Sequence, residues 1–288
     1  MHRPTVVACV LFLAAVAVPV SGNGSRITTS LQLDLTSLSA PPDAQGLHTT
    51  EQAVRGIAAV MSKSLGLAVP DRVTVFIYPG RRAFEQGLIQ DAQLSPMLAA
   101  KVSDYAIGVG MRGQVLLNEQ PHNREWLRLI AHELTHVSQI ELAGGEARGE
   151  QWLAEGMAEW VAFVTLERLG LDALDRRRLQ ALTAVRSHAT LLGGRLDLEA
   201  RGTSRGFSAW HARQGTVPTY QLAFLLADTL IERRGLERMT SYFASFKGSH
   251  DRRANFRRAF GSSIAEFEAD ALGRLKAESA LRDTVSAP

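Results

Sequence analysis

Cysteine is almost absent from this sequence: its 288 residues include only Cys9. Cys9 lies inside an apolar run near the N-terminus, from Val6 to Val18, so a chain that loses this run contains no thiol. Disulfides are thereby excluded from such a chain, and its stability must come from a hydrophobic core. Any metal site in it must use nitrogen and oxygen ligands.

Long hydrophobic runs are also missing. The run from Val6 to Val18 has 13 residues, whereas a membrane-spanning helix needs about 20. It follows a basic N-terminus and precedes the small residues Ser21 and Gly22, which is the pattern of a secretory signal. We therefore expect residues 1–22 to be a signal peptide and the mature protein to be exported, to the periplasm or outside the cell. An uncleaved signal would anchor it, but no stable membrane span is expected after cleavage.

Charge of one sign does not dominate, because 32 basic residues stand against 29 acidic ones and the formal net charge is +3. The densest basic clusters, at residues 176–178 and 252–258, are expected to be solvated helix faces. Nucleic acid is therefore not a predicted partner. The hydrophobic share of 45% and the charged share of 21% are typical of a folded globular protein. The sequence predicts no oligomeric state.

The order of the predicted elements divides the mature chain into two parts. Residues 23–120 combine strand and helix patterns and are expected to form a small mixed α/β lobe. Its predicted elements are a strand through Leu31, Leu33 and Leu35, a helix over 50–65, a strand over 72–78 and a hairpin of 105–110 with 114–118.

Residues 121–288 are expected to form a helical lobe. Its predicted helices cover about 123–143, 150–169, 173–190, 218–234, 237–247 and 263–280. The Gly-rich stretch 193–217 has no clear periodicity, and whether it forms a lid stays open.

The sequence His132-Glu133-Leu134-Thr135-His136 lies within the first of these helices. Residues four apart project from one face of a helix, so the two imidazoles can converge on one metal ion. Glu133 lies one step round the helix, where its carboxylate can reach a water on that ion. The neighbours at 130, 131, 134 and 137 are apolar or small and predict burial. Buried His and Glu side chains need partners, which disfavours the alternative of a solvated surface helix.

A catalytic zinc site usually has three protein ligands and one open position, so two histidines require a third group. The sequence Trp152-Leu153-Ala154-Glu155-Gly156 offers Glu155, separated from His136 by 18 residues. HELTH followed at this interval by WLAEG resembles the gluzincin metallopeptidases, the aminopeptidase N-like and thermolysin-like enzymes. In these enzymes a glutamate on the next helix is the third ligand. The resemblance, which covers residues 130–160, implies Zn²⁺ held by His132, His136 and Glu155.

The sequence departs from the aminopeptidase N-like pattern in two places. Ala154 replaces the asparagine of WLNEG, and no GxMEN-type sequence precedes HELTH. Recognition of a free N-terminus is therefore not implied. A metzincin is excluded, because residues 137–142 contain neither the glycine nor the histidine that this subclass places there.

The resemblance also assigns roles to other side chains. Glu133 would act as general base and pass the proton to the leaving amine. Glu159, one helical turn after Glu155, would hydrogen-bond a ligand histidine, and the alternative is a solvated helix glutamate. Tyr220, near the start of the predicted 218–234 helix, is the candidate donor to the oxyanion, with Tyr242 and His211 as weaker candidates. The alternative for Tyr220 is an aromatic packing residue.

The hairpin over 105–118 precedes the HELTH helix, as does the edge strand that binds extended substrate in zincins. The backbone around Gly108 to Gly110 would then pair with a peptide, and the alternative is an ordinary structural hairpin.

These features predict an α+β, gluzincin-like fold with a mixed N-terminal lobe, a helical C-terminal lobe and a zinc site at their junction. The predicted function is zinc-dependent hydrolysis of peptide bonds in a peptide or protein substrate. One alternative is an exported binding or assembly protein that keeps the site without turnover, although such a scaffold does not need Glu133. The other is a zinc hydrolase of non-peptide amides or esters, which the sequence does not separate from a peptidase.

Overall fold

The computed structural model describes residues 28–39, 44–146 and 148–285. The predicted signal peptide, residues 1–22, lies outside them. The described residues form helices and one four-stranded sheet, as expected for an α+β protein. Contacts divide the chain into two compact units, Met1–Glu141 and Leu142–Pro288. The division falls near the end of helix α4 (Arg124–Ala143), so that most of this helix belongs to the first unit. The predicted boundary between residues 120 and 121 stays a prediction.

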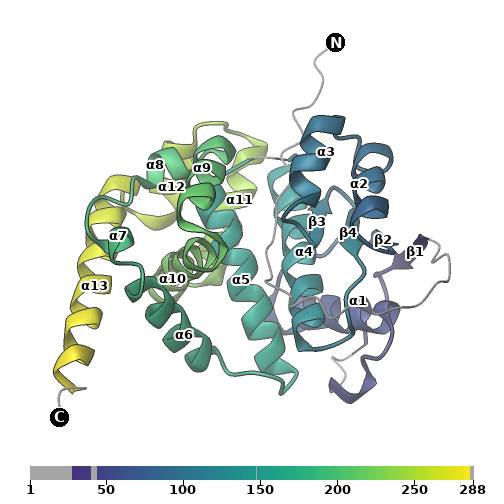
Figure 1. The fold of residues 1–288 in the computed structure, drawn as a ribbon, viewed down its shortest axis with the longest axis horizontal. Coiled ribbons are helices and arrows are strands. Elements are labelled where there is room, and N and C mark those ends of the chain that lie inside the picture. Colours follow the sequence, from purple (N-terminus) through teal and green to yellow (C-terminus); the bar gives the residue numbers. More distant parts are fainter. Residues whose placement is uncertain (1–27, 40–43, 147, 286–288) are drawn as a thin grey trace. The chain divides into compact units, whose positions relative to one another are not determined.

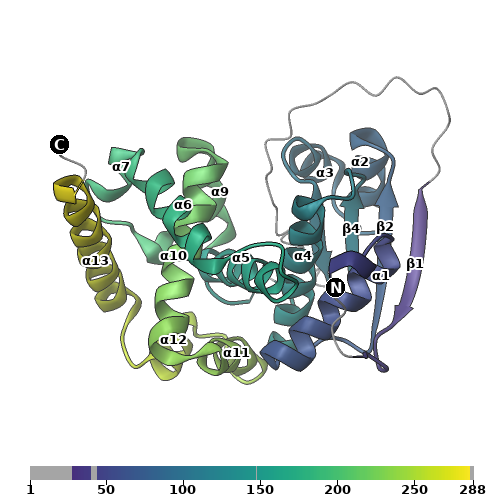
Figure 2. The same ribbon diagram turned by 90° about the horizontal axis from the view of Figure 1, so that it is seen from below.

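The sheet of the first unit has the strand order β1-β2-β4-β3. Its strands are β1 (Thr29–Asp34), β2 (Arg72–Tyr78), β3 (Gly108–Met111) and β4 (Gln114–Asn118). β1 pairs antiparallel with β2, which lies beside it in Figure 2, and β2 pairs in parallel with β4. β3 and β4 form the predicted hairpin, whose turn uses the positive φ of Gly113. The three strand regions predicted from the sequence are therefore confirmed, and β3 lies at one end of the strand order.

Helices cover much of the first unit. α1 (Thr50–Ala59) starts with a capping box of Thr49 and Gln52 and continues as the π-helical turn η2 (Val60–Ser64), which confirms the predicted helix. The short 3-10 turn η1 (Ala44–Gly46) precedes it.

Two further helices of the first unit, α2 (Arg81–Gln90) and α3 (Pro96–Ser103), have no counterpart among the sequence predictions. α2 buries only Phe84, Gly87 and Leu88, and one buried turn is too short to reveal a helical period. The two helices nevertheless help to complete a core that includes Tyr78, Phe84, Leu88, Leu94, Val102 and Val109.

The second unit contains no strand among its described residues. Its α-helices, labelled in Figure 1, are α5 (Gln151–Arg168), α6 (Leu174–Arg186), α7 (Ala189–Leu192), α8 (Leu198–Arg201), α9 (Ser204–Gln214), α10 (Thr216–Arg234), α11 (Leu236–Ala244), α12 (Arg252–Phe260) and α13 (Ile264–Val285). The short 3-10 turn η3 (Ser245–Lys247) follows α11. The predicted helices are thus present, with small differences at their ends. The predicted capping box of Ser263 and Glu266 at the last helix is also present.

Residues 193–217 differ from the expectation of a stretch without periodicity, because they include α8, α9 and the first residues of α10. The carboxylate of Glu268 on α13 accepts hydrogen bonds from the backbone N–H groups of Asp197 and Leu198, at 3.0 and 2.9 Å. This stretch is therefore built from short helices with side-chain caps, which single-sequence periodicity does not reveal.

Helices α5 and α10 pack closely enough to require glycine. A Cβ atom on Gly156 of α5 would lie 2.1 Å from the backbone oxygen of Ala223 on α10. No side chain can be added at this crossing without moving one of the two helices.

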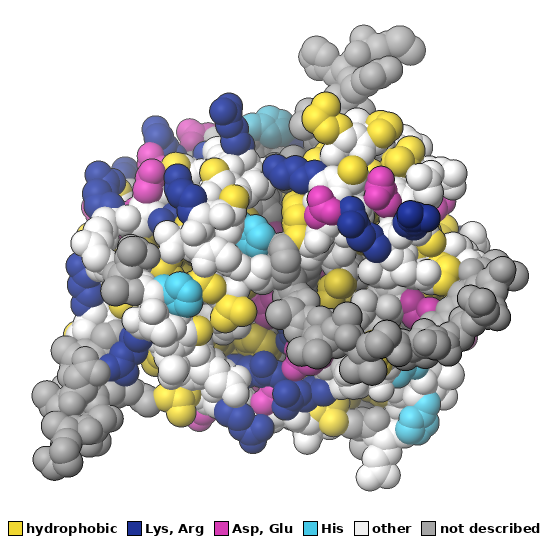
Figure 3. Space-filling view, viewed as in Figure 1, with side chains coloured by type: hydrophobic (Ala, Val, Ile, Leu, Met, Phe, Trp, Pro, Cys, Tyr) yellow, Lys and Arg dark blue, Asp and Glu magenta, His cyan; other side chains and the backbone are white. Residues whose placement is uncertain are grey.

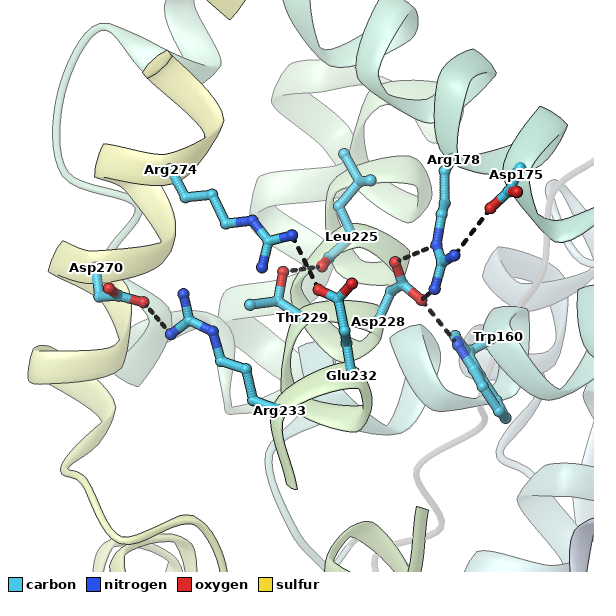
Figure 4. Close-up of polar contacts among 10 residues, drawn as sticks. All are labelled: Trp160, Asp175, Arg178, Leu225, Asp228, Thr229, Glu232, Arg233, Asp270 and Arg274. Carbon is cyan, nitrogen blue, oxygen red and sulfur yellow. Dashed lines mark hydrogen bonds and ion pairs between the residues drawn. The ribbon is translucent and has the colours of Figure 1, made fainter. Parts of the chain in front are cut away.

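A polar network fixes α10 against its neighbours (Figure 4). Asp228 of α10 accepts two hydrogen bonds from the guanidinium of Arg178 on α6, both at 2.8 Å, and one at 3.0 Å from the indole N–H of Trp160 on α5. Ion pairs of Arg233 with Asp270 and of Glu232 with Arg274 connect α10 to α13. The register of α10 is therefore set by charge as well as by apolar packing.

Charged side chains are interspersed on the face of the molecule in Figure 3, where Lys and Arg occur with Asp and Glu among them. Within the described ranges, no helix is both long enough and apolar enough to cross a membrane.

Candidate metal centre

Helix α4 carries the two histidines, and it is buried on nearly all sides at this level. Ile130, Ala131, His132 and Glu133 are each 0% exposed, and His136 is 1% exposed. This confirms the burial that the sequence predicts. The spacing of four residues brings the two rings edge to face, with their Nε2 atoms 2.9 Å apart.

Glu155 completes a group of three potential ligands. His132, His136 and Glu155 each offer one ligand atom, these atoms lie within 4.8 Å of one another, and all three residues are buried. Bonds of about 2.0–2.2 Å in a tetrahedral zinc site would separate the ligand atoms by roughly 3.3–3.6 Å. Two imidazole nitrogens and one carboxylate oxygen form a donor set that zinc and other first-row divalent metals accept. The group could therefore hold a metal ion.

Gln139 constrains the ring of His136. Its Oε1 atom lies 2.9 Å from Nδ1 of His136. Because a carboxamide oxygen only accepts, this contact requires the proton of the neutral imidazole to be on Nδ1. The lone pair is then on Nε2, the atom that faces His132, as a metal ligand requires.

Gln151 makes the corresponding contact with Glu155. Its Nε2 atom donates to Oε1 of Glu155 at 2.8 Å, and its Oε1 accepts from the hydroxyl of Ser204 at 3.1 Å. Ser204 is the first residue of α9. The carboxylate is therefore held by a side chain that is itself held by the next part of the fold.

The carboxylate of Glu133 lies against the backbone of β3. A Cβ atom on Gly108 would be 2.8 Å from Oε1 of Glu133, and one on Gly110 would be 2.4 Å from the backbone oxygen of the same residue. Gly108 and Gly110 lie two residues apart and face the same side of the strand. Glycine at both positions is thus what lets β3 approach α4 so closely at Glu133.

Glu159 is 1% exposed and lies one turn after Glu155 on α5. A solvated helix glutamate, the alternative interpretation from the sequence, does not agree with this burial. The expected hydrogen bond from a ligand histidine stays a prediction.

Tyr220 is buried in the first part of α10, where its ring packs edge-on against Phe207 and His211 of α9. His211 Nε2 also lies 3.0 Å from the hydroxyl of Thr216. Burial lowers the pKa of His211, and the carboxylate of Glu155 opposes the shift. His211 therefore lies within electrostatic range of Glu155, and Tyr220 is its neighbour.

Tyr242, the other weaker candidate for the oxyanion donor, is a core residue. Its side chain is 0% exposed and its ring packs among phenylalanines of the second unit. Its hydroxyl oxygen accepts a hydrogen bond from the backbone N–H of Glu150 at 2.8 Å. These contacts give Tyr242 a structural role.

The contacts of Gln139, Gln151 and Ser204 were not among the sequence predictions. Gln139 lies three residues after His136, and Gln151 four residues before Glu155, so each shares a helix face with a ligand. A glutamine three or four residues from a ligand was therefore the sequence signal that could have identified Gln139 and Gln151. Ser204 is 53 residues from Gln151 in the chain, and nothing in the sequence connects the two.

The chain matches no protein-family model, no curated protein and no solved structure. The resemblance to the gluzincins therefore rests on the sequence of residues 130–160 alone.

Proposed function

We propose that this chain is an exported zinc metallopeptidase of the gluzincin type. The observation that carries the proposal is the buried group of His132, His136 and Glu155, with the carboxylate of Glu133 one residue from a ligand. The spacing of these four residues along the chain is that of the gluzincins. A purely structural zinc site is normally closed by a fourth protein ligand, whereas three ligands beside a glutamate suit hydrolysis.

Zinc bound here would supply Lewis-acid chemistry, acidifying a water molecule and polarising a carbonyl group. The chain's own groups would handle the protons. Glu133 accepts a proton from the water and delivers it to the departing amine. Its burial against β3 limits the positions that the carboxylate can take, so the proton acceptor is oriented before substrate arrives.

Tyr220 is proposed to donate a hydrogen bond to the oxygen that becomes negative during the reaction. Its neighbour His211 lies in electrostatic range of Glu155, which supports a position of this aromatic pair near the metal ligands. Glu159 is proposed to accept a hydrogen bond from a ligand histidine, which its burial favours.

A peptide substrate is proposed because β3 ends the strand order of the sheet and passes the carboxylate of Glu133. An extended peptide that pairs with this edge would bind mainly through its backbone.

The test is digestion of a peptide library by zinc-loaded mature protein, read by mass spectrometry beside a Glu133→Gln control. We expect cleavage at internal or terminal peptide bonds that the control lacks. Turnover of amide or ester substrates without any peptide cleavage would favour a non-peptide hydrolase. Zinc binding without turnover of any substrate would favour an exported binding or assembly protein.

A further inference from the structure

Gln151 occupies the first turn of α5, one turn before Glu155. Residues four apart on a helix lie one above the other, so the carboxamide can reach the carboxylate without a change in the backbone. Its Nε2–H donates to Oε1 of Glu155 at 2.8 Å. An ionised carboxylate only accepts hydrogen bonds, and this fixes which end of the carboxamide faces Glu155.

The other end of the Gln151 side chain is held as well. The hydroxyl of Ser204 donates to its Oε1 at 3.1 Å, and the backbone N–H of Gln151 donates to the carbonyl oxygen of Gly202 at 2.9 Å. Gly202 lies in the turn between α8 and α9, and Ser204 is the first residue of α9, directly after this turn. Gln151 therefore connects Glu155 to this turn.

The turn between α8 and α9 is itself tightly packed. A Cβ atom on Gly202 would lie 1.3 Å from Oε2 of Glu150, a carboxylate that also contacts Arg252 of α12 at 3.2 Å. Thr203 caps α9 by accepting from the backbone N–H of Gly206 at 3.0 Å. Because the turn cannot shift easily, Ser204 offers a fixed hydrogen-bond donor to Gln151.

We propose that Gln151, oriented by Ser204, is a positioning residue for the metal ligand Glu155. The inference rests on the proposed metal centre, and it adds the group that sets the direction of the carboxylate. A carboxylate has about four lone-pair sites, so donation to Oε1 is compatible with metal binding by the same group. Groups that orient a ligand in this way typically raise metal affinity by about 10- to 100-fold.

The experiment measures zinc affinity by competition with a chromophoric chelator, on the mature protein and three variants. These are Gln151→Met, Ser204→Ala and the double variant. Methionine keeps the length of the side chain and removes the donor. We expect Gln151→Met to lose about 10- to 100-fold in zinc affinity, and Ser204→Ala to lose less. The double variant should lose no more than Gln151→Met alone, because Ser204 acts through Gln151.

Two further measurements separate positioning from folding. The visible absorption of the Co²⁺-loaded protein should change in Gln151→Met, because the carboxylate binds the metal at a different angle. Gln180→Met, the same substitution at an exposed position of α6, should change neither affinity nor spectrum. If Gln151→Met folds poorly, the affinity of Ser204→Ala decides the question, since only a hydroxyl is removed.

Wild-type affinity and an unchanged Co²⁺ spectrum in Gln151→Met would overturn the inference and leave the proposed function standing. Additive losses in the double variant would also overturn it, because Ser204 would then act independently of Gln151. If the unmodified protein binds no zinc, the proposed function fails and the inference fails with it.

Discussion

At the scale of single residues, His132, His136 and Glu155 form the one group in the described part of the chain whose side chains could hold a metal ion. We expect the mature protein to bind one zinc ion per chain. His132→Ala and Glu155→Ala should each lose most of the bound metal, because two protein ligands hold a divalent ion poorly. Metal analysis after dialysis measures this, and His250→Ala, which changes an exposed histidine, is the control. Full zinc in both ligand variants would contradict the site.

Glu133 is expected to act in the reaction without binding the metal. Glu133→Gln keeps the size of the side chain and removes the proton acceptor. Zinc content and melting temperature should stay near wild type, while kcat falls by a factor on the order of 100 or more, the scale of general base catalysis. Steady-state kinetics on a cleaved peptide measures this loss. Unchanged kcat would remove Glu133 from the mechanism.

Tyr220 is expected to donate to the oxyanion. Tyr220→Phe should keep zinc and stability but lose roughly 10- to 1000-fold in kcat, with a smaller change in KM. Tyr242→Phe is the matched control, because it removes a buried hydroxyl that accepts from the backbone of Glu150. The control should lower stability by about 1–3 kcal/mol and leave kcat intact. If Tyr220→Phe instead lowers stability and leaves kcat normal, Tyr220 is a packing residue.

At the scale of elements, the contact between β3 and α4 can be tested with two alanine substitutions. Gly110→Ala places a Cβ atom 2.4 Å from a backbone oxygen of α4, which cannot move alone. The strand and helix must then separate, and we expect a loss of about 1–3 kcal/mol in the free energy of unfolding, the cost of overpacking. Urea denaturation measures it. Gly273→Ala, at an exposed helix position with open space around it, should instead raise stability by roughly 0.5–1 kcal/mol.

Gly108→Ala should act on the same contact in a different way. The atoms nearest to its new Cβ are Oε1 and Cγ of Glu133, at 2.8 and 2.9 Å, and Cδ1 of Leu129, at 2.9 Å, so side chains and not the backbone must shift, and the carboxylate of Glu133 shifts with them. We therefore expect a larger loss of kcat and a smaller loss of stability than in Gly110→Ala. Equal effects of the two substitutions on both quantities would contradict this division.

The longest helices around the candidate site are all among the elements that the sequence predicts. Helices α4, α5 and α10 have 20, 18 and 19 residues, enough turns for hydrophobic periodicity or Gly boundaries to reveal them. α8 has four residues and α2 buries a single turn, so their periods are too short to detect.

Prediction of the candidate site is limited by how distinctive the spacing of its residues is. His132, Glu133, His136 and Glu155 were predicted because their spacing is characteristic. A glutamine one turn from a glutamate is common on helices, so Gln151 gives no comparable signal. Its partner Ser204 is brought near only by the packing of α8 and α9, which depends on tertiary contacts.

At the scale of the whole molecule, Glu150 should make stability depend on pH. Burial raises the pKa of Glu150 to about 7, against the opposing charge of Arg252 and from an ordinary value of 4.5. Between these values the folded chain binds more protons than the unfolded chain, so the free energy of unfolding falls as pH rises from about 4.5 to 7. Urea denaturation across pH 5–8 should show a shallower fall in Glu150→Gln than in wild type. Parallel curves for the two proteins would contradict the assignment.

The pair of Arg178 and Asp228 has a consequence for how the chain can change over evolutionary time. Asp228 is 8% exposed and receives both hydrogen bonds of one guanidinium edge. Loss of Arg178 would leave the carboxylate of Asp228 with the indole N–H of Trp160, whereas loss of Asp228 would leave Arg178, one-third exposed, paired with Asp175. Because each partner loses its bidentate contact when the other is replaced, these two positions, 50 residues apart, should covary.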